Sequence, residues 1–305
     1  MLQRPRLIAA TSVLAIGAIV LSGCSSSKKT PAGSGGGSST TSSSSGVDAA
    51  AAALVPAAVK SRGTLNVAMD ATYPPDEFIG TDGKTIQGMD VDLIKALAAA
   101  MGLKTNLVNV KFDSIIPRIQ SGTYDVGMSS FTDNKDREKT VDFVTYFKAG
   151  EGYYVKAGSS KTFDGLDSLC GAKVAVESGT TELTDAQSME KKCPTEGKPK
   201  PTVLSFSDQD QANHAVSSGR ADVGFLDSQV AGYVVKQSNG QFQLTGTAFE
   251  VAPYGIALPK GTGLTQAFLA AMKAVIANGT YQKIMGTWGM QDGAITTPVI
   301  NGAES

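Results

Sequence analysis

The sequence contains an internal repeat, and this repeat constrains the fold more than any other feature. The pattern Ser-Gly-x-x-Asp-Val-Gly occurs at residues 121–127 and again, 97 residues later, at residues 218–224. Asp113 and Asp210 recur at the same offset. In each copy a helical segment ends at glycine, and a short apolar strand follows a tight turn. The repeat therefore predicts two similar α/β lobes, each with a ligand-facing loop after that strand.

Strand-like and helix-like segments alternate around both copies of the repeat. Around the first copy we expect strands over 65–69, 105–110 and 125–129, and helices over 90–101 and 113–120, the second capped by Asp113. Around the second copy we expect strands over 173–177, 203–206 and 222–226, and a helix that begins near Ser178. A strand over 254–258 and helices over 263–278 and 280–288 follow. This alternation is typical of mostly parallel sheets flanked by helices, so the predicted class is α/β.

The chain crosses between the predicted lobes twice, near residues 148–155 and 249–256. Two crossings permit hinge bending, which is how a pair of lobes encloses a ligand. We therefore expect lobe 1 over 61–150 and 254–305, and lobe 2 over 151–253.

The N-terminus has the composition of an export signal followed by a tether. Arg4 and Arg6 precede an apolar run over residues 7–21, which is short for a membrane span. Residues 25–46 are almost entirely Ser, Thr and Gly, a composition that buries no core. We expect a signal peptide over 1–23 and a disordered tether over 24–60.

Charge and cysteine content exclude several classes of function. The formal net charge is −1 and no basic patch occurs, which argues against a nucleic-acid partner. Cys170 and Cys193 form an even pair in a chain that we expect to be exported, so we predict a disulfide between them. A metal site would need more ligands, and the sequence has one histidine and no Cys-x-x-Cys. We expect neither a metal nor a cofactor.

Several loops at predicted strand ends carry groups that suit a free amino acid. Such a ligand has a carboxylate, an ammonium and a side chain, so its site needs a cation, an anion and a wall. Arg137 ends a hydroxyl-rich loop, and its forked guanidinium matches a carboxylate. Segment 177–182 begins a helix, whose free N–H groups attract anions. Asp227 can accept from an ammonium, while Tyr73 and Asp70 offer an aromatic face and an acid.

Each of these residues also has a purely structural interpretation. Arg137 stands in a charged turn, where surface arginines are common. Ser178 and Thr180 are good helix caps, and Asp227 precedes a predicted helix over 228–237 that it can cap. From the residue types alone both interpretations stay open.

The order of these motifs resembles that of the polar amino-acid-binding proteins of ABC importers. The resemblance covers residues 61–290. It is carried by Asp70-x-x-Tyr73-Pro74-Pro75, Gly88-Met89-Asp90-Val91-Asp92-Leu93, Ser121-Gly122-x-x-Asp125, Ser129 to Arg137, Ser178-Gly179-Thr180-Thr181, Ser218-Gly219-Arg220-Ala221-Asp222 with Asp227, and Tyr254-Gly255-Ile256-Ala257. It implies the periplasmic binding protein type II fold: two lobes, each a mostly parallel sheet flanked by helices, joined by two hinge crossings.

The resemblance also implies roles for matched positions. Arg137, Ser130 and Thr181 would clamp the ligand carboxylate. Asp227, with Ser130 and Thr132, would hold the ammonium. Tyr73 and Phe131 would sandwich the side chain, and Asp70 would face its far end. The predicted ligand-binding residues are Asp70, Tyr73, Ser129, Ser130, Phe131, Thr132, Arg137, Gly179, Thr180, Thr181, Glu182 and Asp227.

Two departures from the family pattern bear on the ligand. Asp76 stands where the family often has an aromatic residue, and Glu182 where it often has Gln or His. With Asp70, Glu77 and Glu177 they concentrate negative charge near the predicted cleft. We expect a polar or basic amino acid, with a basic one favoured, while the neutral amide of glutamine stays compatible.

The segment Leu21-Ser22-Gly23-Cys24 resembles the lipobox of bacterial lipoproteins. It implies a lipid on Cys24 that anchors the chain to the outer face of the membrane without spanning it. Together the resemblances imply a monomeric, extracytoplasmic component that delivers an amino acid to a membrane permease. Two alternatives remain: a sensory partner of a membrane receptor, and a dehydratase-like enzyme on the same fold. We expect no enzyme, because the one histidine, His214, lies away from the predicted loops.

Overall fold

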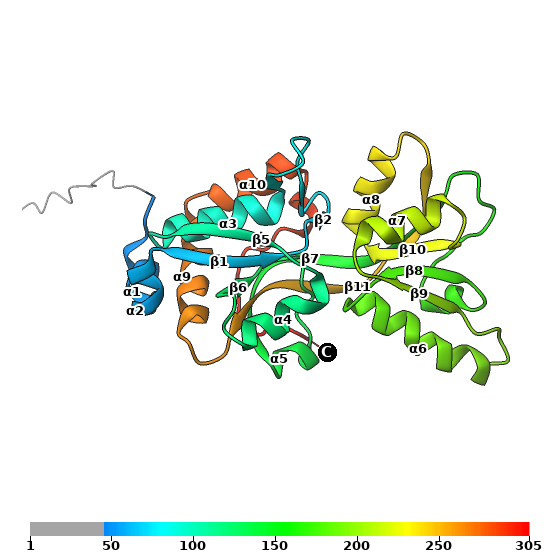
Figure 1. Cartoon of the computed structure of the whole chain (residues 1–305), viewed down its shortest axis with the longest axis horizontal. Helices are drawn as coiled ribbons and strands as arrows, with labels where there is room; N and C mark the ends of the chain where they lie inside the picture. Colours follow the sequence, from blue (N-terminus) through cyan, green and yellow to red (C-terminus); the bar gives the residue numbers. More distant parts are fainter. Residues whose placement is uncertain (1–45, 305) are drawn as a thin grey trace, which may run out of the picture. The chain divides into compact units, whose positions relative to one another are not determined.

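One eight-stranded sheet runs through residues 46–304, the part of the chain that the computed structural model describes (Figure 1). The predicted signal peptide, Cys24 and most of the predicted tether lie outside the described residues. In order across the sheet the strands are β5 (Lys104–Asn109), β1 (Thr64–Met69), β6 (Val126–Gly127), β11 (Phe242–Pro259), β7 (Val141–Lys156), β10 (Val223–Asp227), β8 (Lys173–Glu177) and β9 (Thr202–Phe206).

The strand pairing repeats across the two lobes. In lobe 1, β1 pairs in parallel with β5 on one side and β6 on the other. In lobe 2, β8 pairs in parallel with β9 and β10 in the same arrangement. Between these groups lie β7 and β11, two long antiparallel strands that contain both predicted crossings. The predicted α/β class with mostly parallel pairing is confirmed.

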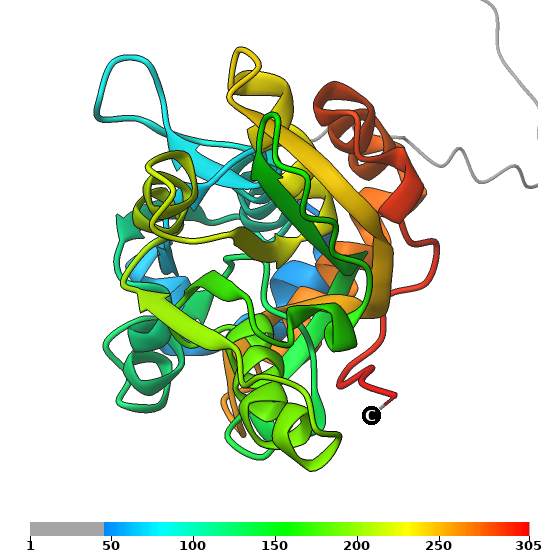
Figure 2. The same cartoon turned by 90° about the vertical axis from the view of Figure 1, so that its right-hand side faces the viewer.

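Helices cover both faces of the sheet in lobe 2. Alternate strand residues point to opposite faces. Val174 packs in a core with α6 (Thr181–Thr195), whereas the next residue, Ala175, packs in a separate core with α7 (Gln209–Ser217) and α8 (Ser228–Gln237). Figures 1 and 2 show α6 on one side of these strands and α7 on the other.

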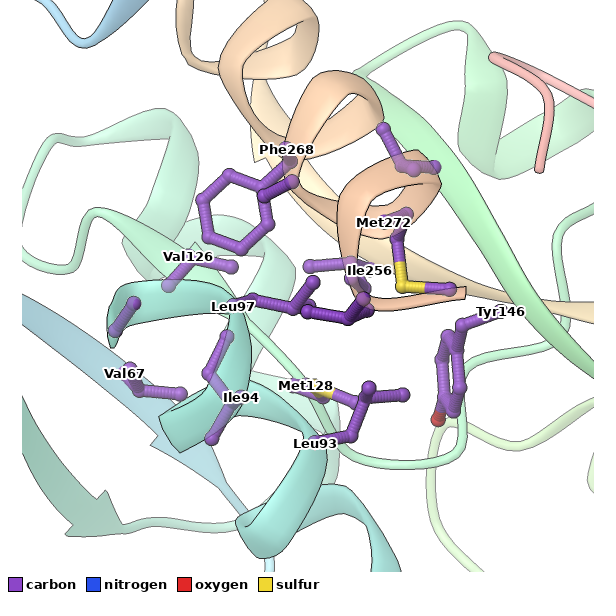
Figure 3. Close-up of a cluster of buried hydrophobic side chains, with 14 of the residues drawn as sticks. Val67, Leu93, Ile94, Leu97, Val126, Met128, Tyr146, Ile256, Phe268 and Met272 are labelled. Atoms are coloured by element: carbon purple, nitrogen blue, oxygen red, sulfur yellow. The ribbon is translucent and has the colours of Figure 1, made fainter. Parts of the chain in front are cut away.

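The same layering holds in lobe 1. Val67 of β1 lies in a core with α3 (Met89–Ala100) and α9 (Leu264–Ala277), and Figure 3 shows Leu97, Ile256 and Phe268 meeting there. Ala68 faces the other way, toward α4 (Phe112–Gln120). The remaining elements are α1 (Ala49–Leu54), α2 (Ala57–Arg62), α5 (Lys135–Glu138), α10 (Thr280–Trp288), the 3-10 turns at Leu166–Leu169 and Gln291–Gly293, and a small sheet of β2 (Thr72–Tyr73), β3 (Glu77–Ile79) and β4 (Ile86–Gln87).

The repeated motif has the same structural role in both lobes. Helices α4 and α7 begin 97 residues apart, and the glycine after each has φ +74. The aspartates of the motif then tie each turn to the central strand. Asp125 accepts the backbone N–H of Asn66 at 2.7 Å, and Asp222 accepts that of Lys173 at 2.9 Å. The equal spacing therefore reflects the same turn in both lobes. In each turn an aspartate carboxylate accepts a hydrogen bond from a backbone N–H of β1 or β8.

Two local predictions are wrong. The tether does not extend to residue 60, because α1 and α2 are helical and Ala51 is fully buried beside α9. Asp113 does not cap α4, which begins one residue earlier at Phe112 with Lys111 in the N-cap position. The carboxylate of Asp113 instead accepts a hydrogen bond from Ser178 of lobe 2, at 3.1 Å.

The predicted disulfide between Cys170 and Cys193 is confirmed. It joins the 3-10 turn before β8 to the end of α6, and the two cysteines are 23 positions apart in sequence. Among residues 46–304, no helix has the length and apolar character needed to span a membrane.

Candidate functional site

A pocket lies between the two lobes and is lined by residues of both. It sits at the carboxyl ends of β1, β6, β8 and β10, where parallel strands bring their following loops together. Ten of the twelve residues predicted to bind ligand line it. The full lining is Asp70, Tyr73, Glu77, Phe112, Ser129, Ser130, Thr132 and Arg137 from lobe 1, and Glu177, Thr180, Thr181, Glu182 and Asp227 from lobe 2.

Arg137 supplies positive charge to the pocket. Its guanidinium donates to the carbonyl of Thr132 at 2.8 Å and to that of Gly179, in lobe 2, at 2.9 Å. It also lies 5.5 Å and 5.4 Å from the ring centres of Phe112 and Phe131, within cation–π range. Burial lowers the pKa of Arg137 to about 10, so the side chain stays charged at neutral pH. Because its partners are neutral, the charge remains available to an anion.

Asp227 supplies negative charge from the opposite lobe. The hydroxyl of Tyr73 donates to Oδ2 of Asp227 at 2.8 Å, and the backbone N–H of Asp227 donates to the same hydroxyl at 2.9 Å. Asp227 occupies the N-cap position of α8, but its side chain makes no capping hydrogen bond. Burial raises the pKa of Asp227 to about 7. Of the two interpretations of this aspartate, the geometry favours the pocket over the cap.

Carboxylates outnumber cations in the lining by five to one. Asp70, Glu77, Glu177, Glu182 and Asp227 each have at most 7 % of their surface exposed. Burial is the largest cause of a raised pKa at all five, and it raises that of Glu182 to about 8. Buried carboxylates without matching cations favour a positively charged guest, since such a guest offsets the cost of their desolvation.

Thr180 and Thr181 begin α6 and complete the lobe 2 wall. Thr180 is the N-cap, and its hydroxyl accepts the backbone N–H of Leu183 at 3.1 Å. The cap predicted as an alternative for this segment is therefore present, and the residue lines the pocket as well. The hydroxyl of Thr181 meets that of Thr132 across the lobes at 3.3 Å. Both threonines leave backbone N–H groups of a helix N-terminus next to the pocket.

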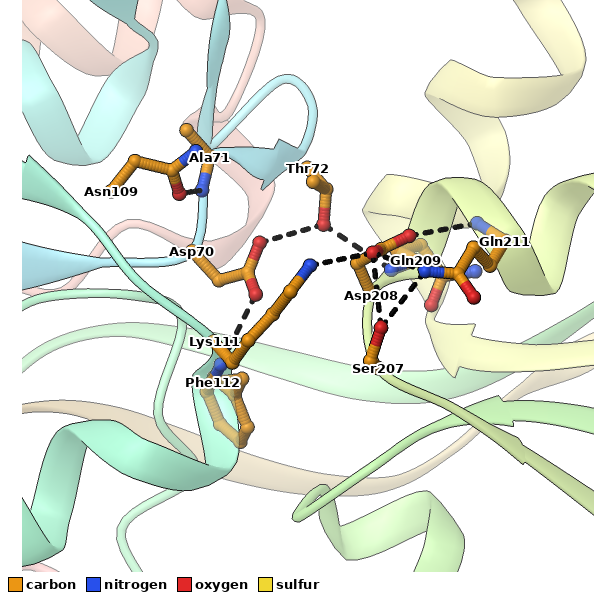
Figure 4. Close-up of polar contacts among 10 residues, drawn as sticks. All are labelled: Asp70, Ala71, Thr72, Asn109, Lys111, Phe112, Ser207, Asp208, Gln209 and Gln211. Atoms are coloured by element: carbon orange, nitrogen blue, oxygen red, sulfur yellow. Dashed lines mark hydrogen bonds and ion pairs between the residues drawn. The ribbon is translucent and has the colours of Figure 1, made fainter.

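Asp70 is held by contacts that reach into lobe 2. The hydroxyl of Thr72 donates to Oδ1 of Asp70 at 2.8 Å, and the N–H of Phe112 donates to Oδ2 at 3.1 Å. The same threonine hydroxyl accepts the N–H of Gln209, the first residue of α7, at 3.2 Å. Figure 4 shows this path from Asp70 through Thr72 to lobe 2. The orientation of Asp70 is thereby linked to contact between the lobes.

An ion pair joins the lobes beside this path. Lys111 Nζ lies 2.6 Å from Oδ2 of Asp208 (Figure 4). The two residues are the N-caps of α4 and α7, so they occupy equivalent positions in the repeat. The ion pair therefore joins the N-termini of α4 and α7 across the two lobes.

Comparison with known proteins identifies the family. Residues 65–291 match the model of the bacterial extracellular solute-binding proteins, family 3. The chain belongs to this family. It is 36 % identical over 249 residues, 81 % of each chain, to the arginine-binding protein ArgT of Corynebacterium glutamicum. It is 32 % identical over 236 residues, 75 % of this chain and 84 % of the other, to the L-cystine-binding protein TcyJ of Escherichia coli.

Solved structures agree with this assignment to the family 3 solute-binding proteins. An ancestral arginine-binding protein bound to arginine superposes with a TM-score of 0.68 at 37 % identity, covering 74 % of this chain and 98 % of that one. The two-lobed solute-binding architecture implied by the motif order is confirmed, and the family is extracellular by description.

Two of the residues predicted to bind ligand do not face the pocket. Phe131 has 1 % of its surface exposed and stacks behind Phe112, with ring centres 4.5 Å apart. Phe112 lines the pocket in its place. Gly179 is also outside the lining and acts through its carbonyl, which accepts from Arg137. Its backbone has φ +84, and a Cβ there would lie 2.8 Å from that of Asp113, so glycine permits the lobes to meet.

The sequence interpretation missed three lining residues as ligand contacts: Phe112, Glu77 and Glu177. We expected Glu77 and Glu177 only to add negative potential. Glu177 ends β8, and Phe112 begins α4 soon after β5. Their positions after predicted strands could therefore have identified both as residues of the site. Glu77 lies on β3, outside the main sheet, and the sequence carries no comparable signal for it.

Asp76 lies behind the lining rather than in it. It is fully buried, and its Oδ2 accepts from the hydroxyl of Ser130 at 2.9 Å. Ser129 makes the parallel contact, donating to Glu77 at 2.8 Å while accepting the N–H of Asp70 at 2.9 Å. The two serines therefore fix the acids of the small sheet against the loop after β6.

Proposed function

We propose that this chain is the substrate-binding component of an ABC importer for a basic amino acid, with arginine the first candidate. The observation that carries the proposal is the set of five buried carboxylates that share one pocket with a single arginine. A neutral or acidic guest would leave these buried carboxyl groups without a cationic partner, whereas a cationic guest can pair with them in their ionised form. A basic amino acid brings two cationic groups and one anionic group, which suits the lining.

The proposed ligand lies between the two lobes as a zwitterion. Its carboxylate pairs with Arg137 and with the free N–H groups at the start of α6. Its ammonium pairs with Asp227, and the aliphatic stem packs against Tyr73 and Phe112. Because Arg137 and Asp227 belong to different lobes, only the closed state satisfies both charges of one ligand, so binding favours closure.

Relatives support an amino acid as ligand, and the pocket supports a basic one. ArgT is named for arginine and TcyJ for L-cystine, so ligand choice differs among relatives of similar identity. Family membership alone therefore leaves the side-chain class open, and the acidic lining supports a basic one.

A thermal-shift screen tests this proposal. The purified protein is mixed with each of the twenty amino acids, ornithine and citrulline, because a ligand that binds the folded state raises the melting temperature. We expect arginine, lysine and ornithine to raise it more than glutamine, and glutamate to have no effect. A larger rise with glutamate than with any basic amino acid would contradict the proposal.

We also propose that the chain is exported with a signal peptide over 1–23 and anchored through a lipid on Cys24. The support is the lipobox-like segment and the family's extracellular description. The anchored, monomeric protein would pass its ligand to a membrane permease, as a binding protein rather than an enzyme. Cys24→Ser should move the protein from the membrane fraction to the soluble fraction, and retention in the membrane would argue against the anchor.

A further inference from the structure

We propose that Glu177 determines specificity by holding, together with Asp70, the cationic end of the ligand side chain. This inference deepens the proposed function and rests on it. Sequence motifs assigned a role to Asp70 but none to Glu177, and the pairing of the two acids becomes visible only in the folded chain.

The two acids occupy equivalent places in the two lobes. Asp70 directly follows β1, the central strand of the parallel group in lobe 1. Glu177 is the last residue of β8, the central strand of the corresponding group in lobe 2. Both line the pocket, with 2 % and 3 % of their surface exposed. Closure of the lobes therefore brings one carboxyl group from each side toward the same point.

No cation in residues 46–304 forms an ion pair with either acid. Oε1 of Glu177 is buried and lacks any hydrogen-bond partner within this described range. In the described part of the chain, Asp70 accepts hydrogen bonds from the Thr72 hydroxyl and the Phe112 N–H, both neutral donors. Lys111 approaches the pair, but its ammonium binds Asp208 instead. Burial and the facing carboxylate of Asp70 raise the pKa of Glu177 well above its usual range.

A guanidinium suits this pair of neighbouring carboxyl groups better than a neutral group does. Its planar fork of N–H donors can serve two carboxylates at once, one from each lobe. Citrulline has nearly the same shape as arginine, yet its terminal urea carries no charge. The affinity ratio of arginine to citrulline therefore measures the contribution of the acid pair with the rest of the ligand held constant.

The test compares this ratio in the wild-type protein and in Glu177→Gln, by calorimetry with arginine and with citrulline. We expect the Kd for arginine to rise by about tenfold or more, because the glutamine offers no charge, while the Kd for citrulline stays within about twofold. Glu177→Leu also removes the charge and should lower the ratio of arginine to citrulline affinity in the same way. It shows whether the effect of Glu177→Gln comes from the lost charge or from the new amide group.

Glu182→Gln is the matched control, since it makes the same substitution in the same pocket. Glu182 lies beside Arg137 and Asp227, and its charge also acts on Glu177, so Glu182→Gln should lower the ratio of arginine to citrulline affinity less than Glu177→Gln does. An unchanged ratio in both Glu177 variants would overturn the role of Glu177 alone. Wild-type protein that binds neither arginine nor citrulline nor any other basic amino acid would instead contradict the proposed function.

Discussion

Removal of the ion pair between Lys111 and Asp208 should weaken ligand binding without touching the ligand. The two atoms lie 2.6 Å apart across the lobes, the lysine side chain is 51 % exposed and the aspartate 10 %. For a pair so exposed on one side, screening and side-chain entropy leave a net contribution of about 0.5–1 kcal/mol. Because opening the lobes breaks the pair, this energy adds to the closed state and hence to affinity. Lys111→Met should therefore raise the ligand Kd about two- to fivefold.

A double-mutant cycle separates this contact from other effects. Asp208→Asn is the partner variant, because Asp208 also caps α7 by accepting the N–H of Gln211 at 3.0 Å, and asparagine preserves that cap. Calorimetry on the two single variants and the double variant gives the coupling energy. We expect about 0.5–1 kcal/mol at low salt and a much smaller value at 0.5 M salt.

The chain offers a matched control pair within lobe 1. Lys135 and Glu138 lie 3.2 Å apart with side-chain exposures of 53 % and 13 %, close to those of the first pair. Since this pair does not cross the cleft, Lys135→Met should leave the ligand Kd unchanged. Equal effects from Lys135→Met and Lys111→Met, or zero coupling between Lys111 and Asp208 at low salt, would refute the link between this contact and closure.

Three other outcomes follow from the structure. Arg137→Ala should cost at least about 2–3 kcal/mol of binding energy by calorimetry, because the ligand carboxylate loses a charge-assisted pair; a smaller loss would argue against that role. Replacing Cys170 and Cys193 by serine should lower the free energy of unfolding by about 3 kcal/mol in urea titrations, because the disulfide no longer restricts the unfolded loop between positions 23 apart. A variant as stable as the wild-type protein would contradict this stabilising effect of the disulfide. The ligand-free protein should lose stability between about pH 5 and pH 8, since the pKa values of Asp227 and Glu182 are raised to about 7 and about 8 and the folded state keeps protons that the unfolded state has released. A rise in stability over this range would contradict the assigned burial.

The repeat predicted the lobes well because both copies rely on local chemistry. The helix, the glycine with positive φ and the aspartate that hydrogen-bonds the turn to the central strand lie within about fifteen residues of one another. Their spacing is therefore visible in the sequence. The loops of the site followed from the same logic. Parallel strands place their carboxyl ends at one edge of a sheet, so the sequence places Asp70, Ser129 and Asp227 near one site.

Features set by long-range packing were not visible in the sequence. Phe112 and Phe131 come from different segments, and only their stacking decides that Phe112 faces the pocket while Phe131 lies behind it. The direction of Asp113, which contacts Ser178 instead of capping α4, depends likewise on how the lobes meet. The early helix α1 lies within the predicted tether, because the burial of Ala51 depends on distant residues of α9 that the local sequence does not reveal.

The central claim is that opposite charges from two lobes meet on one amino acid. A crystal structure of the protein with bound L-arginine tests it most directly. We expect the ligand carboxylate within hydrogen-bond distance of the Arg137 guanidinium and the α-ammonium within hydrogen-bond distance of the Asp227 carboxylate. A ligand bound with its carboxylate away from Arg137, or held by one lobe only, would contradict the account.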